Sequence, residues 1–395
     1  MSEWKKCAIG DVVTLRQGFA INAKSKHYIS KEPTSLALLR IADMKSGSRE
    51  IYVKEDIPKN FIAQPQDIVY TRTGNVGLVF RNNYGVVHNN CFTVTPNDEK
   101  TLSRDFLYYL LQSKYFFEKA NSLARGAAQP DLPHSLFNSI EISYPELNCQ
   151  QQIASILTRY DSLIENYQKQ IKLLEEAAQR LYKEWFVDLH FPGHENTKTV
   201  DGVPEGWEKK RIKDFVELQS GYAFKSSTFE EGCPYKIVTI KNVKDGVFEG
   251  ENVSTVRTVP EKMPNHCFLK DGDILLSLTG NVGRVCMVIG ENYLLNQRVA
   301  KLKTDYPAYT YSLFRSHEMF ITVSNLANGA AQQNVSPIRI GDIDIVMAND
   351  ELMKKFERVA GAYVDEIIKH HRQIRLLTEA RDRLLPKLMS GEIAV

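Results

Sequence analysis

The chain has 395 residues, of which 43% are hydrophobic, and a net charge of +2 at pH 7. This length and apolar content allow two hydrophobic cores, and the near balance of charge permits a nucleic-acid partner without requiring one. The six scattered cysteines form no C-x-x-C pair, which indicates neither a zinc site nor a disulfide framework. Because no apolar run is long enough to span a bilayer and no signal peptide is recognisable, we expect a cytoplasmic protein without a membrane partner.

The first part of the chain predicts a mixed α and β domain. Short segments rich in β-forming residues, separated by Gly, Asn and Pro, predict strands over 8–15, 36–41, 67–71 and 86–95. Ser103 is a suitable N-cap for a helix over 104–120, in which leucines and aromatic residues recur at helical spacing. Residues 307–325 predict the counterpart of this helix later in the chain.

A heptad pattern follows each mixed segment. The positions spaced by sevens are Ile153, Tyr160, Tyr167, Leu174 and Leu181 in the first pattern and Phe356, Tyr363, His370, Leu377 and Leu384 in the second. Such heptads predict a helix that packs lengthwise along another helix. Gln170 and Gln373 occupy equivalent seam positions, where a buried polar residue could set the register of the pair.

These elements occur twice, which is the most informative feature of the chain. Trp4, Ile9, Asp11, Leu15, Gly18 and Ala20 return as Trp207, Ile212, Asp214, Leu218, Gly221 and Ala223, at an offset of 203 residues. Thr73–Gly77 (TGNVG) returns as Thr279–Gly283, and Gly126–Gln129 (GAAQ) returns as Gly329–Gln332. A repeat of about 200 residues is too long for a solenoid unit and indicates a duplicated domain.

The duplication predicts the domain organisation. We expect a mixed α/β (α+β) fold in which two similar globular domains, 1–148 and 207–350, are joined by two long antiparallel heptad helices, 149–187 and 351–395, in a pseudo-twofold internal repeat. Residues 188–206, rich in Pro and Gly, predict a linker, with the first helix ending near Phe186 or Val187. The alternative is two independent helices, each packed on its own domain.

The sequence has no motif for catalysis that we recognise. Phosphate-binding loops, H-E-x-x-H, G-x-S-x-G and the amino-methyltransferase motif are all absent, and neither a catalytic residue nor a metal ligand is expected. His370 and His371 lie on a heptad helix, where packing is the simpler interpretation. His88 could contact a base or be an ordinary surface histidine.

Polar residues on probable loops are the better candidates for function. TGNVG could be a tight hairpin turn, but its neighbours are rich in Arg, Asn and Gln, the side chains that make bidentate contacts with base edges. The candidate DNA-contact residues are Arg72, Thr73, Gly74, Asn75, Arg81, Asn89, Asn90, Arg125 and Gln129 in the first copy, and Thr279, Gly280, Asn281, Arg284, Gln297, Arg298, Gln332, Gln333 and Asn334 in the second. Lys24, Lys26, Lys225 and Lys241 could supply phosphate contacts.

The two copies match in framework and differ in these polar residues. Arg72 corresponds to Leu278, Leu78 to Arg284, and Pro130-Asp131 to Gln333-Asn334. A shared scaffold with different polar side chains is what two domains need if they recognise two different short sequences.

In its whole length the chain resembles the specificity subunit of type I restriction–modification systems (HsdS). The resemblance rests on W-x(4)-I-x-D at the start of each half, GYAFKS at 221–226, TGNVG, GAAQ, and the segments EWFVDLHFP at 184–192 and LLPKLMSGEI at 384–393. The first copy has Gln17–Asn22 where the second has Ser220–Lys225, so we interpret this segment as framework rather than as a contact site.

The resemblance implies a non-catalytic DNA-reading subunit. Each globular part would be a target recognition domain for one half of a bipartite double-stranded DNA site. The helices would set the spacing and dock two methyltransferase (HsdM) subunits, through which restriction (HsdR) subunits would join. S-adenosylmethionine, ATP and Mg²⁺ would bind to those partners, and no cofactor to this chain.

Two other functions are to be weighed against this one. A fused restriction–modification enzyme would have to fit its catalytic domains into a length already occupied by two recognition domains and two helices. The other alternative is a structural protein without a DNA role, and the modest net charge is its best support. A DNA reader should lose affinity steeply as salt displaces its phosphate contacts.

Overall fold

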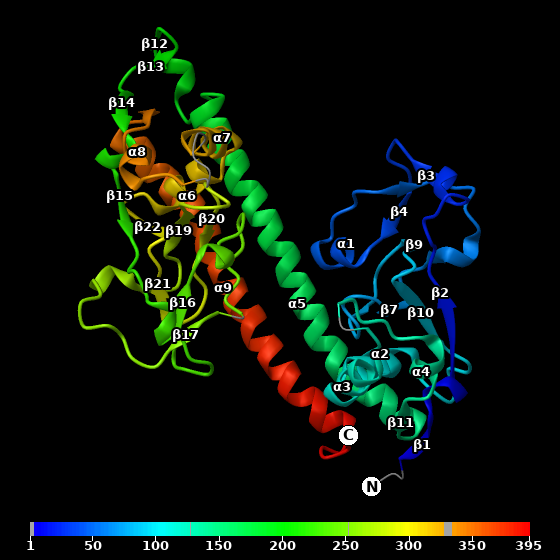
Figure 1. The fold of residues 1–395 in the computed structure, drawn as a ribbon. Coiled ribbons are helices and arrows are strands. Elements are labelled where there is room, and N and C mark those ends of the chain that lie inside the picture. The colour runs from blue at the N-terminus through cyan, green and yellow to red at the C-terminus, as the bar shows by residue number, and fades with distance from the viewer. Residues whose placement is uncertain (1–3, 127, 252, 328–333) are drawn as a thin grey trace. The chain divides into compact units, whose positions relative to one another are not determined.

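The computed structural model describes residues 4–126, 128–251, 253–327 and 334–395 (Figure 1). The chain divides into two compact units. Unit 1 comprises Met1–Ser162 and Leu377–Val395, and unit 2 comprises Leu163–Leu376. Both are mixed α and β, as predicted. Within the described ranges, no helix is both long enough and apolar enough to cross a membrane.

Unit 1 contains two main sheets. The first is antiparallel, in the order β2 (Val13–Gln17), β10 (Cys91–Pro96), β7 (Ile68–Thr71) and β8 (Val79–Phe80). The second has the order β3 (Ile29–Ser30), β5 (Tyr52–Val53), β4 (Leu36–Leu39), β9 (Gly85–Val87) and β6 (Ile62–Ala63). β1 (Lys5–Ala8) pairs with β11 (Glu141–Tyr144), and the short helices are α1 (Ile41–Ser46), α2 (Arg104–Gln112), α3 (Lys114–Leu123) and α4 (His134–Asn138).

Unit 2 repeats this plan. Its first sheet has the order β15 (Val216–Ser220), β22 (Val299–Thr304), β19 (Ile274–Ser277) and β20 (Val285–Met287). Its second has the order β17 (Thr255–Val256), β16 (Tyr235–Val238), β21 (Tyr293–Leu295) and β18 (Phe268–Leu269). β14 (Glu208–Arg211) pairs with β23 (Asp344–Met347), and the short helices are α6 (Pro307–Arg315), α7 (His317–Leu326) and α8 (Pro337–Gly341). The predicted linker contains a small hairpin of β12 (Thr199–Val200) and β13 (Val203–Pro204).

The single helix predicted over 104–120 is two helices. Ser113 has extended ψ of 145°, which ends α2, and its hydroxyl accepts a hydrogen bond from the Phe116 amide, which starts α3. Ser316 divides α6 from α7 in the same way, through the Met319 amide. A serine in the middle of a helical pattern can act as a cap, because its hydroxyl replaces a backbone acceptor. Hydrophobic spacing alone did not reveal this break.

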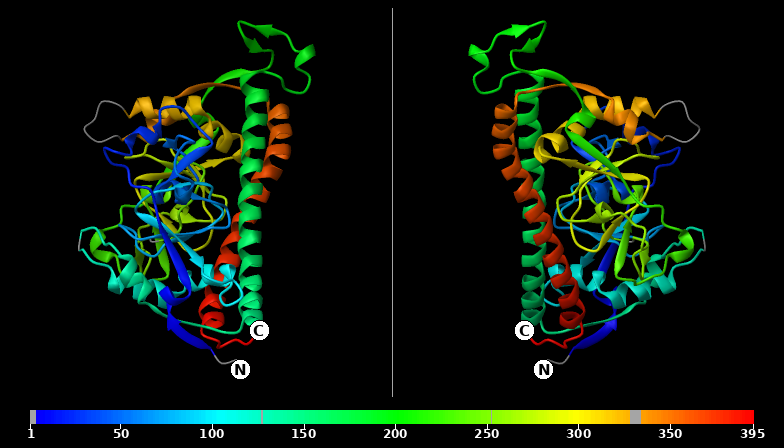
Figure 2. Two further views of the ribbon diagram at one scale, coloured as in Figure 1. Left: turned by 90° about the vertical axis from the view of Figure 1, so that its right-hand side faces the viewer. Right: turned by 90° about the vertical axis from the view of Figure 1, so that its left-hand side faces the viewer.

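Two long helices, drawn as ribbons in Figure 2, contribute side chains to the core of each unit. These are α5 (Leu147–Tyr182), which continues as a π-helix over Lys183–Val187, and α9 (Asp350–Met389). In unit 1, Ile153 and Leu157 of early α5 share a core with Leu388 and Met389 of late α9. In unit 2, late α5 contributes Tyr182 and Trp185 to a core that contains Phe356, Ala360 and Ile367 of early α9.

The most buried residues of α5 in unit 2 lie beside the heptad positions, at one edge of the apolar stripe. Within unit 2, Ile164, Ile171 and Ala178 are buried, whereas Tyr167, Leu174 and Leu181 are only half-buried. The expectation of a buried polar pair is wrong for Gln373, which is exposed, while Gln170 is half-buried. The apolar stripe on each helix is wide, so the heptad spacing did not determine which of its edges faces the core. His370 packs its ring on Tyr167, with the ring centroids 4.9 Å apart, which agrees with a packing role.

Two glycines at equivalent positions of the repeat, Gly18 and Gly221, lie directly against the backbone of a neighbouring loop. A Cβ added at Gly18 would lie 2.2 Å from the His88 carbonyl oxygen, and one at Gly221 would lie 2.3 Å from that of Asn296. We therefore expect Gly18→Ala and Gly221→Ala each to lower the free energy of unfolding by about 1–3 kcal/mol, measured by chemical denaturation.

Gly361 on α9 provides the matched control, because an added Cβ there has no neighbour within 4 Å. Gly361→Ala should raise the free energy of unfolding by about 0.5–1 kcal/mol through helix propensity. If all three variants changed stability alike, the close backbone approach at Gly18 and Gly221 would not be a real constraint.

Candidate functional site

The TGNVG motif is a tight hairpin turn in both units. It connects β7 to β8 in unit 1, where the Thr71 hydroxyl accepts a hydrogen bond from the Leu78 amide at 2.9 Å and donates to the Asn75 carbonyl oxygen. In unit 2 the Ser277 hydroxyl does the same with the Arg284 amide, at 3.0 Å, and the Asn281 carbonyl oxygen. The closed turn leaves Asn75 and Asn281 at exposed tips.

Two other loops meet this turn in unit 1. The amides of Arg72 and Thr73 donate to the Asn90 carbonyl oxygen, at 2.8 and 3.2 Å, in the loop between β9 and β10. The Gly74 amide donates to the Pro130 carbonyl oxygen at 2.8 Å, in the loop after α3. We call residues 72–78, 88–90 and 125–131 the first loop cluster, without Ala127, which lies outside the described residues.

Unit 2 has the same convergence. The Leu278 amide donates to the Arg298 carbonyl oxygen at 3.0 Å, and the Val335 amide donates to the Leu278 carbonyl oxygen at 2.9 Å. The Thr279 hydroxyl donates to the Asn334 side-chain oxygen at 2.9 Å. We call residues 278–284, 296–298 and 334–335 the second loop cluster. Segments that are far apart in the sequence are thus brought together twice by equivalent hydrogen bonds.

Most of the candidate residues lie on these clusters. Asn75, Arg125, Gln129, Gly74, Gly280, Asn281, Gln297, Arg298 and Asn334 are exposed, Arg72, Thr73, Asn89 and Asn90 are half-buried, and Thr279 is buried. Gln332 and Gln333 lie outside the described residues. His88 is half-buried, its Nδ1 accepts from the Asn90 amide at 3.3 Å, and burial lowers its pKa, so it supports the loop as a neutral side chain.

Two of the candidate arginines are engaged within the fold. Arg81 lies just beyond β8 and binds Asp161 of α5 at 3.1 Å, with 16% of its side chain exposed. Arg284 is at the base of the second turn, where its guanidinium lies over the Phe320 ring, 4.5 Å from the centroid. The spacing around TGNVG placed both near the turn and gave no information on the direction of their side chains.

Arg72 is held by a partner that its position in the sequence did not reveal. Its guanidinium donates to both carboxylate oxygens of Asp131, at 3.1 and 2.6 Å, and to the Gln17 side-chain oxygen at 3.1 Å. The Thr73 hydroxyl also donates to Asp131, at 2.5 Å. The Arg72 guanidinium, followed by the Thr73 hydroxyl, lowers the pKa of the Asp131 carboxyl. A forked pair of this kind fixes both side chains in one geometry.

The counterparts in the other copy change together. Leu278 stands in place of Arg72, and Asn334 in place of Asp131, while the threonine that donates to either residue is retained. The difference between the copies is therefore partly an internal pair of residues. Gln17 and Asp131 belong to the site although neither was among the candidates. The joint replacement at 72 and 131 was the signal that could have pointed to Asp131.

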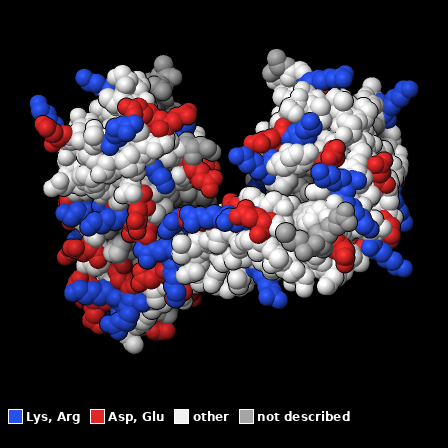
Figure 3. All heavy atoms as spheres, turned by 90° about the horizontal axis from the view of Figure 1, so that it is seen from below, with Lys and Arg blue, Asp and Glu red and all other residues white. Residues whose placement is uncertain are grey.

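The surface charge is mixed. Lys24, Lys26, Lys225 and Lys241 are all exposed. Lys and Arg side chains are interspersed with Asp and Glu over the face in Figure 3. Among the described residues, no group of His, Cys, Asp and Glu could hold a metal ion. Attraction of a polyanion would therefore depend on local arrangements of cations.

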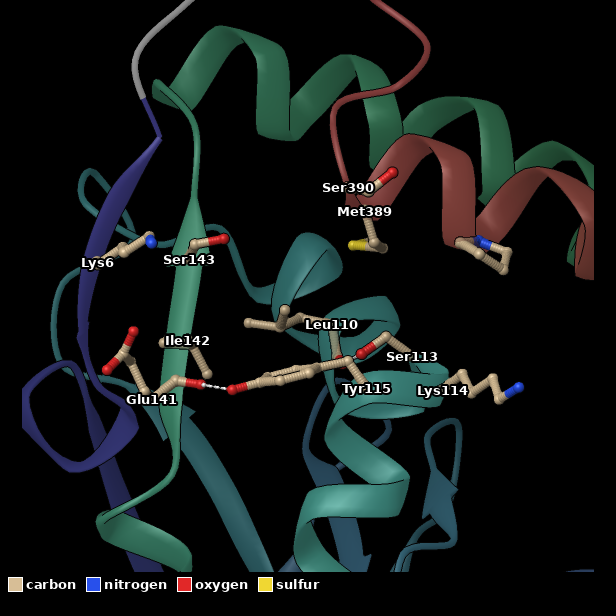
Figure 4. Close-up of a pocket in the computed structure, with 11 residues that line it drawn as sticks. Lys6, Leu110, Ser113, Lys114, Tyr115, Glu141, Ile142, Ser143, Met389 and Ser390 are labelled. Atoms are coloured by element: carbon tan, nitrogen blue, oxygen red, sulfur yellow. Dashed lines mark hydrogen bonds between the residues drawn. The ribbon is translucent and has the colours of Figure 1, made fainter.

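A cavity in unit 1 lies apart from the loop cluster. It has a volume of about 400 Å³ and is lined by apolar side chains such as Leu110 and Met389 together with polar ones such as Lys6 and Glu141. Tyr115 lies across it and donates its hydroxyl to the Glu141 carbonyl oxygen at 3.1 Å (Figure 4). Of the candidate residues that the structure describes, none lines this cavity.

Comparison with known proteins gives consistent results. The family model of the type I restriction modification DNA specificity domain matches residues 1–176 and 204–346. The MjaIX specificity subunit of Methanocaldococcus jannaschii is 27% identical, with 100% of this chain and 94% of that relative covered. The MjaVIII specificity subunit of the same organism is 30% identical, over 85% of this chain and 81% of the relative. The solved S subunit of a type I system from M. genitalium superposes with a TM-score of 0.62 at 17% identity, covering 98% and 96% of the two chains, and so shares the fold.

The Arg72–Asp131 pair can be tested by a double-mutant cycle. Arg72→Leu and Asp131→Asn should each destabilise the chain, and the double variant, which copies the residues of the second cluster, should lose less than the sum of the two. We expect a coupling of about 1 kcal/mol in the free energy of unfolding, because the pair is partly exposed to solvent. If the effects of the two substitutions were additive, the interaction between Arg72 and Asp131 would contribute nothing to the free energy of unfolding.

The same pair predicts a dependence on pH. Because the folded pKa of Asp131 lies below its ordinary value of 3.8, the stabilisation is present above that value and is lost as pH falls through the lowered pKa. The stability difference between wild type and Asp131→Asn should therefore be constant near neutral pH and shrink below about pH 4. Denaturation curves measured across this range would reveal the opposite trend if the sign were wrong.

Proposed function

Because the chain belongs to the family of type I restriction–modification DNA specificity domains, we propose that each of its two loop clusters reads one half of a bipartite DNA site. The specificity subunit recognises the DNA sequence and is not the catalytic subunit of such a system. The proposal concerns which parts of the chain perform the recognition and how they are spaced.

The observation that carries this proposal is the repeated convergence of two other loops on the TGNVG turn. Equivalent backbone hydrogen bonds build the same support in both units, from Arg72 to Asn90 in one and from Leu278 to Arg298 in the other. Rigid support matters because base recognition depends on side chains held in a defined geometry. The exposed Asn, Gln and Arg side chains on these supports suit the donor and acceptor pattern of the major groove.

The side chains that differ between the clusters provide two separate specificities. Leu78 and Arg284 follow the turn at equivalent positions, as Asp131 and Asn334 do in the third loop. Because an asparagine side chain can pair with adenine and a carboxylate can accept from cytosine, exchanges of this kind change the base that is preferred. We propose 1–148 and 207–350 as the two target recognition domains, with the exposed lysines contacting phosphates.

The two long helices would set the distance between the half-sites. Early α5 shares a core with late α9 in unit 1, and late α5 shares one with early α9 in unit 2. This order supports an antiparallel pair in which the internal repeat forms a pseudo-twofold arrangement.

The exposed side chains of the helices, among them Leu163, Leu173 and Leu376, are candidates for contact with two methyltransferase subunits. S-adenosylmethionine, ATP and Mg²⁺ would bind to the methyltransferase and restriction partners, with the restriction subunits joining through the methyltransferase.

Matched variants at the turn tips test which cluster reads which half-site. Asn75→Ala should reduce discrimination at one half-site by about fivefold or more, because a base contact contributes about 1–3 kcal/mol, and should leave the other half-site unchanged. Asn281→Ala is the matched control and should show the reverse pattern. The measurement is methylation by the chain with its methyltransferase partner on DNA altered in one half-site at a time.

Equal weakening of both half-sites by either variant would contradict the assignment of one cluster to each half-site. A protein without a DNA role would show no sequence-dependent methylation at all. Binding measured across salt concentrations adds an independent check, since phosphate contacts make affinity fall steeply as salt rises.

Changes in helix length test the spacing. Adding one heptad at matched positions in α5 and α9 lengthens the pair by about 10 Å, roughly three base pairs of DNA. We expect the spacer between the methylated half-sites to lengthen accordingly, as mapped by sequencing the methylated genome of a host that expresses the variant complex. An unchanged spacer would mean that the helices do not determine the distance.

A further inference from the structure

Within unit 1, one carboxylate joins the first recognition part to both long helices. Asp161 of α5 has 9% of its surface exposed and receives Arg81 at 3.1 Å through Oδ2. Its other oxygen, Oδ1, receives Arg381 of α9 at 2.8 Å. The Tyr109 hydroxyl of α2 donates to Oδ2 at 2.6 Å. Side chains from the hairpin, α2 and α9 thus converge on Asp161.

Arg81, at the end of the hairpin, also contacts two tyrosines of α2. Arg81 lies over the Tyr108 ring, 4.2 Å from its centroid, and its Nη2 also donates to the Tyr109 hydroxyl at 3.1 Å. Its position in the chain is important, because it follows β8, the second strand of the hairpin that carries the Thr73–Gly77 turn. A displacement of Arg81 would therefore move β8, the strand that follows the turn.

The duplicated half has apolar residues at the positions equivalent to this network, while its own partly buried ion pair, Arg315 of α6 with Glu175 of α5 at 3.8 Å, lies at other positions. The positions equivalent to Arg81, Asp161 and Arg381 in the repeat are Met287, Val364 and Ala178. All three are buried, and Met287 and Val364 belong to one core cluster. Replacing a buried ion network by packed apolar residues is often neutral or stabilising. The fold itself therefore does not require charged residues at these three positions.

We propose that Asp161 is a positioning residue, whose two-sided pairing with Arg81 and Arg381 fixes the orientation of the β7–β8 hairpin on the helices. This inference rests on the proposed function, because the hairpin carries the first loop cluster. Hydrogen bonds to a carboxylate are directional, whereas apolar contacts allow neighbouring elements to slide. Base readout tolerates only about 0.5 Å of misplacement, so a small rotation of the hairpin is enough to weaken it.

A triple variant that introduces the apolar residues found at the equivalent positions of unit 2 tests this role. Arg81→Met, Asp161→Val and Arg381→Ala together replace the network by the residues of the repeat. We expect this variant, assembled with its methyltransferase partner, to fold with a melting temperature close to wild type. Its discrimination at the first half-site should fall about tenfold, equivalent to the loss of one base contact, while the second half-site is read normally. Glu118→Gln, in an exposed pair with Lys114, is the control. It should change neither the melting temperature nor the discrimination at the first half-site.

Other outcomes would overturn the proposal. Wild-type discrimination at both half-sites in the triple variant would show that any packed junction suffices, and failure of this variant to fold would show that the network serves stability. Loss at both half-sites would point to a general effect on the helices. If wild-type complex itself methylated DNA without sequence preference, the proposed function would fail first, a result that the wild-type assay reveals independently of any variant.

A conservative change at Arg381 adds a second readout. Arg381→Lys keeps the charge and lacks the planar fork, so it should recover part of the discrimination that Arg381→Ala loses. A purely structural role for Arg381 would make discrimination follow the melting temperature of the two variants. The proposal requires discrimination at the first half-site to change at matched stability.

Discussion

The structure depends on a set of backbone hydrogen bonds that tie one hairpin turn to two other loops. In unit 1 these run from the amides of Arg72, Thr73 and Gly74 to carbonyl oxygens at 90 and 130, and in unit 2 equivalent bonds connect Leu278 with Arg298 and Val335. A hydroxyl from Thr71 or Ser277 closes the turn from inside. Because main-chain groups make these bonds, the support tolerates different side chains at its surface.

This division between backbone support and side-chain surface explains how one fold can hold two specificities. The glycines that let the loops approach closely, Gly18 and Gly221, are common to both halves. The side chains above the support differ, and some of the differences are linked, as Arg72 with Asp131 and Leu278 with Asn334. A residue that looks like a DNA contact can therefore also be half of an internal pair, and exchange between the halves has to respect that pairing.

The junctions between the recognition parts and the long helices use different residues in the two units. Unit 1 uses a carboxylate between two arginines, while the equivalent positions of unit 2 are apolar. Unit 2 has its own polar junction elsewhere, where Glu357 of α9 accepts hydrogen bonds from the amides of Ala308 and Tyr309 at the start of α6, at 3.0 and 2.7 Å. These differences make the two halves chemically distinct although they share one architecture.

The sequence by itself determined the duplication, the mixed α and β composition, the two long helices and the loops that carry the candidate residues. These features are local or repeated, so hydrophobic spacing and matching motifs were sufficient to identify them. The tertiary structure decided the direction of individual side chains. It placed Arg81 in the fold rather than at the turn, gave Arg72 a carboxylate partner 59 residues away, exposed Gln373, and divided one predicted helix at Ser113. Each of these outcomes depends on which residues distant in the chain become neighbours, and that information is absent from any local pattern.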